Sequence, residues 1–222
     1  MKTECVKRYL FFFTGLFAMS FGVAFSIKAD LGTSPISSVP YVLSLIMPIT
    51  VGKITIAMHC VFILLQVLIL RRNYQFVQLM QLPVAIAFGF MIDFAVWLLD
   101  GVHYSSYLMQ WLFCIIGIVM VAAGVSMEVT ANVVTLAGEG LVLAVCKVAP
   151  VKFSSMKVCF DCILVAIAAL TGIFIKGKLL GVREGTIAAA MFVGLLSKPI
   201  CRPMTKLMNR VLGRSSASPE AE

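Results

Sequence analysis

Long uncharged apolar segments are the feature that most constrains this chain. The first, Tyr9–Ile27, has 19 residues between Arg8 and Lys28, and as a helix it is about 28 Å long, enough to cross a bilayer core. Seven more apolar segments follow, at Pro35–Ile49, Ile54–Leu70, Phe76–Leu99, Tyr107–Met127, Val133–Ala149, Val158–Ile175 and Gly185–Ile200. Because only 13% of the residues are charged and 61% are apolar, the chain cannot build a water-facing surface. The sequence predicts an all-α, polytopic integral membrane protein with about eight helical segments.

The two halves of the chain resemble each other in sequence. A constant shift of 102 residues aligns Gly15, Gly22, Ala29, Asp30 and Thr33 with Gly117, Gly124, Ala131, Asn132 and Thr135. Slightly larger shifts align Lys53 with Lys157 and Gly89 with Gly194. Many transporter folds are built from such duplications. We therefore predict a first membrane repeat over residues 1–100 and a second over residues 101–200, with four segments in each.

A basic segment occupies residues 201–222. Basic residues recur every four positions there and just before it, at Lys198, Arg202, Lys206, Arg210 and Arg214, and apolar residues fall on another helical face. This pattern predicts a basic amphipathic helix on the cytoplasmic surface, with its cations facing anionic lipid. The last residues, SSASPEAE, are typical of a disordered tail.

The second segment of each repeat is short and irregular. Pro35–Ile49 contains Pro40, and Val133–Ala149 carries Glu139 between two glycines. Irregular backbone is tolerated in a membrane only against protein or water, and such segments at matching places in two halves indicate a binding site. Two topologies stay open: eight crossings, or six full spans with two short re-entrant segments. We favour eight, because a re-entrant helix needs an equally deep return path.

The distribution of Lys and Arg predicts the orientation. With eight crossings, twelve basic residues fall on the side of the N-terminus and six on the other side, and with six crossings the division is thirteen and five. Basic residues are in excess in cytoplasmic loops. We therefore expect a multi-pass protein of a bacterial plasma membrane, with its N-terminus and C-terminus in the cytoplasm.

Three stretches carry a resemblance to a known family: GVAFSIKADLGTSPISSVPYVLS, LMQLPVAIAFGFMID and GVREGTIAAAMFVGLLSKP. They are similar to the YczE/YyaS/YitT group of bacterial integral membrane proteins, and closer to its YczE branch. The sequence departs from that branch at Arg183, where a small residue is more usual, and at His59, where a polar amide is expected. The resemblance covers roughly residues 9–200. It implies a membrane topology and no agreed biochemical activity.

Carboxylates inside apolar segments are candidates for carrying a coupled proton or ion. Placing a charged side chain near the centre of a membrane helix costs about 2.5–3.5 kcal/mol on insertion scales, so such residues tend to have a function. Asp93, Glu139 and Asp161 lie in or next to apolar segments. Lys157 precedes Asp161 by four residues, so an ion pair on one helical face is an equally good interpretation of Asp161.

Polar side chains in two matching turns are the candidates for binding a solute: Asp30, Thr33, Ser34, Ser37, Ser38, Asn132, Thr135 and Glu139. A helix that begins at Pro35 directs free N–H groups at whatever occupies the turn. The alternative is that Thr33 or Ser34 only caps this helix. The recurrence of polar residues in the second half favours a site between the two repeats.

Catalytic and cofactor-binding motifs are missing from the sequence. His59 and His103 have no nucleophile motif near them, and the Cys159/Cys162 pair has no second pair to complete a metal site. We expect no enzyme activity, no metal, no other cofactor and no nucleic-acid partner. The sequence predicts a transporter that moves a small polar or ionic solute through a cavity between the repeats. The alternative is a membrane scaffold or assembly factor that supports a membrane-associated enzyme or pathway. The oligomeric state stays open.

Overall fold

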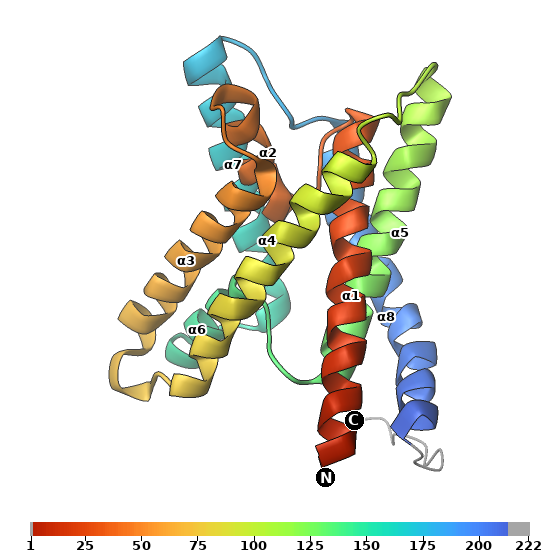
Figure 1. Ribbon diagram of the computed structural model, residues 1–222. Helices are drawn as coiled ribbons and strands as arrows, with labels where there is room; N and C mark the ends of the chain where they lie inside the picture. The colour runs from red at the N-terminus through yellow and green to blue at the C-terminus, as the bar shows by residue number, and fades with distance from the viewer. Residues whose placement is uncertain (1, 213–222) are drawn as a thin grey trace.

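The computed structural model describes the backbone of residues 2–212 and the side chains of residues 4–210. Six helices are long and apolar enough to cross a membrane: α1 (Lys2–Ala29), α3 (Val51–Leu70), α4 (Gln81–Leu98), α5 (Tyr107–Ala131), α7 (Phe153–Lys176) and α8 (Glu184–Leu212) (Figure 1). Two shorter helices are α2 (Pro35–Ile46) and α6 (Ala137–Val148), and two 3-10 helices, η1 (Arg71–Asn73) and η2 (Phe76–Met80), connect α3 to α4. The described residues contain no strand. The predicted all-α multi-pass membrane fold is confirmed.

The two short helices decide the topology. Each of them has 12 residues, which gives about 18 Å of helix against a hydrocarbon core of about 30 Å. Figure 1 shows α2 in the upper part of the molecule and α6 in the lower part. The preference for eight crossings is therefore wrong, and the alternative of six full spans with two re-entrant segments fits the structure. The apolar runs looked long enough because the first included the connection after α2 and the second included the turn before α6.

The backbone takes the same course in both halves at the shift of 102. Asp30 after α1 and Asn132 after α5 both have positive φ, at 53° and 48°. The residue before α2, Ser34, has φ −59° and ψ 152°, and its counterpart Leu136 has φ −57° and ψ 149°. The shift persists to the residues before α3 and α7, which pairs Lys53 with Ser155 rather than with the expected Lys157.

Glycines hold α1 and α5 close together, and this pair makes the most extensive helix contact in the fold. A Cβ added to Gly22 would lie 2.8 Å from the carbonyl oxygen of Gly117, and one added to Gly124 would lie 2.6 Å from that of Gly15. Small residues allow such close approach of helices in lipid. Because Gly22 meets Gly117 while Gly15 meets Gly124, the two helices run antiparallel.

The C-terminal basic segment is continuous with α8. This helix runs through Pro199 and Pro203 to Leu212, so no separate surface helix begins near residue 201. Met208 is buried and Met204 is partly buried, and both pack in a core cluster that includes Phe11 and Phe12 of α1. The apolar face of this segment therefore contacts protein. The predicted tail lies outside the described residues, and the contact with anionic lipid stays a prediction.

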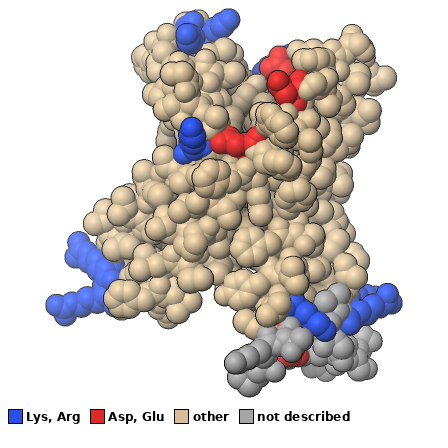
Figure 2. Space-filling view, viewed as in Figure 1, with Lys and Arg blue, Asp and Glu red and all other residues tan. Residues whose placement is uncertain are grey.

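The charged side chains follow the expected pattern for a membrane protein. Figure 2 shows Lys and Arg mainly near the two ends of this face, with a broad, largely uncharged surface between them. Side chains such as Leu68, Phe90 and Phe174 are more than 60% exposed on the described surface. An apolar exterior of this extent is stable in contact with lipid chains.

We predict that Gly22→Ala destabilises the fold and that Gly194→Ala does not. The methyl group at residue 22 would lie 2.7 Å from Val121 Cγ2 and 2.8 Å from its backbone nitrogen, which forces α1 and α5 apart at a cost of about 1–3 kcal/mol. A Cβ at residue 194 would meet nothing within 4 Å. Thermal unfolding of the purified proteins in detergent measures both effects. Equal unfolding temperatures for the two variants would contradict the glycine contact.

Candidate functional site

A cavity of about 270 Å³ lies beside the turn between α5 and α6, and we call it the acidic pocket. It is lined by Glu128, Val129, Asn132, Val133, Val134, Thr135, Glu139, Leu143 and Phe153. Three predicted site residues, Asn132, Thr135 and Glu139, are therefore brought together. The Arg8 guanidinium of α1 donates a hydrogen bond of 3.0 Å to the Ala131 carbonyl, which places this turn beside the N-terminal part of α1.

Glu128 is the most deeply buried residue of the acidic pocket, with 3% of its surface exposed. Its Oε1 accepts a hydrogen bond of 2.8 Å from the backbone N–H of Leu136, the residue that precedes α6. Its Oε2 is buried and has no hydrogen-bond partner within the described chain. Glu128 is absent from the predicted site because the expected fifth segment ended at Met127. The shift of 102 could have drawn attention to Glu128, because it aligns this carboxylate with Ser26 in the first half.

Glu139 lies in the first turn of α6 and is half-buried. It forms no hydrogen bond or ion pair with any residue that the structure describes. The glycines on either side of it allow neighbours to approach closely, because a Cβ at Gly138 would collide with the side chain of Ile36 and one at Gly140 would lie 2.6 Å from Nε2 of Gln81. The start of α6 is thereby packed against the start of α2, and the carboxylate of Glu139 faces the acidic pocket.

A buried pair of glutamines supports the start of α6. Gln66 Nε2 donates hydrogen bonds to Gln81 Oε1 at 2.9 Å and to the Ala137 carbonyl at 3.0 Å. Both glutamines are buried, with exposed fractions of 0% and 4%. Carbonyls in the first turn of a helix accept from N–H groups one turn later, so Gln66 adds a second donor to Ala137 and ties α3 to α6. Side chains from α3, from the start of α4 and from α5 therefore fix where α6 begins.

The first half has no carboxylate at the two matching positions. At the shift of 102, Glu128 corresponds to Ser26 and Glu139 corresponds to Ser37, and both serines are buried. Ser26 Oγ donates to the Gly22 carbonyl at 3.0 Å, and Ser37 Oγ accepts from Ser34 Oγ at 3.2 Å. The same backbone course is therefore built without either carboxylate.

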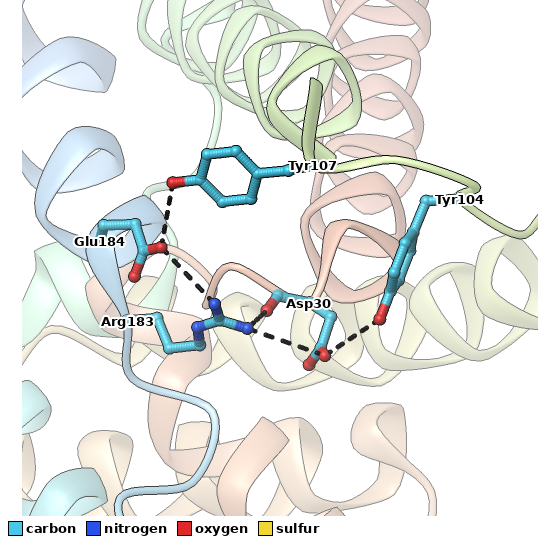
Figure 3. Close-up of polar contacts among 5 residues, drawn as sticks. All are labelled: Asp30, Tyr104, Tyr107, Arg183 and Glu184. Carbon is cyan, nitrogen blue, oxygen red and sulfur yellow. Dashed lines mark hydrogen bonds and ion pairs between the residues drawn. The ribbon is translucent and has the colours of Figure 1, made fainter. Parts of the chain in front are cut away.

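Asp30 belongs to a different cluster, which Figure 3 shows. Arg183 Nη1 donates a hydrogen bond of 2.7 Å to the Asp30 carbonyl and lies 3.9 Å from its Oδ2, which also accepts from the Tyr104 hydroxyl at 3.3 Å. Arg183 Nη2 lies 3.5 Å from Glu184 Oε1, which accepts from the Tyr107 hydroxyl at 3.3 Å. We call these five residues the Arg183 cluster. It ties the α1–α2, α4–α5 and α7–α8 connections together.

A second cavity, of about 570 Å³, lies at this end of the molecule. It is lined by Ile27, Lys28, Asp30, Tyr41, Leu45, Val96, Val102, His103 and Tyr104. The predicted single site that joins the Asp30 and Asn132 turns is therefore wrong. Since α1 and α5 run antiparallel, the turns that follow them lie at opposite ends of the molecule. Eight crossings would have placed them at the same end.

The remaining polar residues of the first turn are buried among themselves. Ser34 makes no side-chain cap bond to α2, and Ser38 Oγ donates to the Pro35 carbonyl at 2.6 Å. The Thr33 hydroxyl is buried and has no partner among the described residues. The alternative that Thr33 or Ser34 caps α2 through its side chain is therefore not supported.

Asp93 and Asp161 both have partners. Asp93 Oδ2 accepts a hydrogen bond of 2.7 Å from Thr50 Oγ1, and its Oδ1 accepts one of 2.8 Å from the backbone N–H of Gly52, so this carboxylate caps the start of α3. Asp161 accepts from Lys157 Nζ at 2.8 Å, as the structural interpretation of that pair predicted. Among the three predicted coupling residues, only Glu139 is left without a hydrogen bond or ion pair in the described part of the chain.

Comparison with known proteins adds a family to this geometry. A family model described as "Family of unknown function (DUF6198)" matches residues 6–202. The chain belongs to this family. Its description gives no activity and does not name the YczE/YyaS/YitT group, so that resemblance stays a prediction. No curated protein and no solved structure matches the chain significantly.

We predict that Glu128→Ala destabilises this DUF6198 protein more than Glu128→Gln does. Glutamine retains an oxygen that accepts from the Leu136 N–H, whereas alanine leaves this buried donor without a partner, which costs about 1–3 kcal/mol. Thermal unfolding in detergent compares the two variants with the parent protein. If the alanine variant is as stable as the glutamine variant, Glu128 does not support the start of α6.

Proposed function

We propose that this protein transports a small polar or ionic solute across a bacterial plasma membrane, with the acidic pocket as a solute-binding site. One observation carries the proposal: Glu128 is buried beside a broken membrane helix with one carboxylate oxygen unpartnered. A buried carboxylate is costly unless a cation, a proton or hydrogen-bond donors compensate it. A solute that compensates the charge of Glu128, or a proton that alternates with this solute, accounts for a carboxylate at this buried position.

We further propose that the two halves are inverted repeats. Each half contributes three membrane-spanning helices and one short helix, and an odd number of crossings turns the second half upside down relative to the first. The glycine contacts fit this relation, because Gly15 matches Gly117 in the repeat while Gly22 matches Gly124. Contacts of Gly15 with Gly124 and of Gly22 with Gly117 are what a two-fold axis between α1 and α5 produces. Inverted repeats of this kind are common among secondary transporters.

The barrier between the two cavities supports alternating access. Ile36, at the start of α2, meets Gly138, at the start of α6, so the two broken helices contact each other between the two ends of the molecule. The acidic pocket lies on one side of this contact and the larger cavity on the other. Rocking of one half against the other about the α1–α5 contact would open either side in turn.

The proposed orientation places both termini and the acidic pocket on the cytoplasmic side. With six crossings, thirteen Lys and Arg residues lie on the side of the N-terminus and five on the other. Coupling to a proton or ion gradient is assigned to Glu139, because Asp93 and Asp161 are engaged in contacts that stabilise α3 and α7. No ATP-binding motif is present in the sequence, so any uphill movement uses a gradient or a separate energising partner.

We predict that Glu139→Gln strongly lowers solute flux while the protein stays folded. Purified protein in liposomes is assayed with a panel of small ions and polar solutes, by tracer uptake and by charge movement on supported membranes. Loss of one charge-assisted contact, worth about 1.5–3 kcal/mol, lowers flux at sub-saturating solute by roughly tenfold or more. Asp100→Asn is the matched control, because Asp100 pairs with Lys28 on the surface and its side chain is 83% exposed.

Two results would contradict transport. The first is the absence of flux for every solute in the panel, and the second is a Glu139→Gln variant that moves solute as fast as the parent. Co-purification of the inactive protein with a membrane enzyme would then support the scaffold or assembly function instead.

A further inference from the structure

We infer that the acidic pocket selects a small organic ammonium ion, with one protonated amine and a short apolar body. As a statement about the transported solute this rests on the proposed function, but binding can be measured without transport. The chemistry of the pocket carries the inference in three respects: its charge, its open hydrogen-bond acceptors and its apolar walls.

The charge of the pocket favours a cation. Two of the nine lining residues, Glu128 and Glu139, are carboxylates, and none of the nine is Lys, Arg or His. Lys157 acts electrostatically on both carboxylates from outside the lining, and its ammonium group is already bonded to Asp161 at 2.8 Å. Because Lys157 and Asp161 neutralise each other, the charges of the two pocket carboxylates are not balanced by Lys157.

One carboxylate oxygen of Glu128 is held in place as a hydrogen-bond acceptor. Its Oε1 is held by the N–H of Leu136, which fixes the orientation of the carboxylate and leaves the buried Oε2 with no partner among the described residues. An alkylammonium group carries up to three N–H donors and no acceptor, so it can bind Glu128 Oε2 and Glu139 together. Asn132 and Thr135 line the same space, and each carries a side-chain oxygen that can accept a hydrogen bond.

The rest of the wall favours an organic cation over a metal ion. Five lining residues are apolar: Val129, Val133, Val134, Leu143 and Phe153. A bare Mg²⁺ or Ca²⁺ needs about six to eight oxygen ligands, and no group of three His, Cys, Asp or Glu residues within residues 4–210 is placed to hold a metal. The Phe153 ring adds a surface that attracts cations. A volume of about 270 Å³ suits a ligand at the small end of the usual range of roughly 300–1,000 Å³.

The comparison of the two halves bears on why both carboxylates are present. Ser26 and Ser37 occupy the positions of Glu128 and Glu139 on the same backbone in the first half, where their hydroxyls bond locally. The second half therefore carries two costly charges where the first half has serines, although Glu128 also supports the start of α6 through its bond from Leu136. A ligand whose positive charge is complementary to them accounts for both substitutions at once.

Binding of n-butylammonium to the full-length protein in detergent, measured by isothermal titration calorimetry at constant ionic strength, tests this inference. The uncharged analogue n-butanol has a similar apolar body, and KCl and MgCl₂ serve as inorganic cations. We expect saturable binding of n-butylammonium and at least about tenfold weaker binding of n-butanol. Neither KCl nor MgCl₂ displaces n-butylammonium when added at the same concentration of positive charge. Glu128→Gln and Glu139→Gln each weaken binding by about tenfold or more, whereas Asp100→Asn does not change it.

The glutamine variants remain interpretable because their unfolding temperatures without ligand report whether they fold. Equal affinity for n-butanol, displacement by K⁺ or Mg²⁺, or unchanged affinity in folded glutamine variants would each overturn the ammonium site. Binding that depends on both glutamates without any flux in liposomes would uphold the site and refute transport. Flux of another solute that depends on Glu139, without n-butylammonium binding, would uphold transport and refute the ammonium site.

Discussion

Backbone polar groups at the broken helices must be satisfied by the protein itself, because lipid offers them no hydrogen-bond partner. At the start of α6, Glu128 of α5 accepts from the Leu136 N–H, and Gln66 of α3 ties the helix in place by donating to the Ala137 carbonyl. Asp93 caps the start of the spanning helix α3 in a similar way, because it accepts from the Gly52 N–H. The contacts of Glu128 and Gln66 allow α6 to begin inside the membrane, and they place a carboxylate at the pocket.

The antiparallel contact of α1 with α5 determines how the two half-sites are arranged. Because α1 and α5 run in opposite directions, the turn at Asp30 and the turn at Asn132 lie at opposite ends, separated by the contact between α2 and α6. The two turns share a backbone course but differ in chemistry. One faces an acidic pocket, and the other joins an exposed cluster centred on Arg183. A directional process such as transport benefits from this asymmetry, since the two sides need not bind solute equally well.

Sequence patterns predicted the parts of this structure that depend on local hydrophobicity. The apolar runs located the helices, the shift of 102 found the corresponding turns with Asn132 and Thr135, and the glycine-flanked charge in a short apolar run found Glu139. The number of crossings was not predictable in this way, because an apolar run does not show where its helix ends. The run Pro35–Ile49 has 15 residues but only 12 of them form α2.

Contacts between distant residues account for the other differences. The sequence gives no sign that Asp93 caps α3, since Gly52 and Asp93 are 41 residues apart. Glu128 lies next to a long apolar run, and only the folded structure shows that it lines the pocket and accepts from Leu136. The error of joining both turns in one site followed directly from the error in topology, because the parity of crossings in each half sets which end of the molecule each turn occupies.

The re-entrant arrangement of α2 and α6 is the central claim, and cysteine accessibility tests it most directly. Ile49→Cys, Arg72→Cys and Val151→Cys, in a protein whose native cysteines are replaced, lie in the α2–α3, α3–α4 and α6–α7 connections. We predict that a membrane-impermeant maleimide labels Ile49→Cys from the side opposite the N-terminus, and labels Arg72→Cys and Val151→Cys from the side of the N-terminus. Exchange of the sides on which Ile49→Cys and Arg72→Cys react, with Val151→Cys unchanged, would show eight crossings and contradict the account.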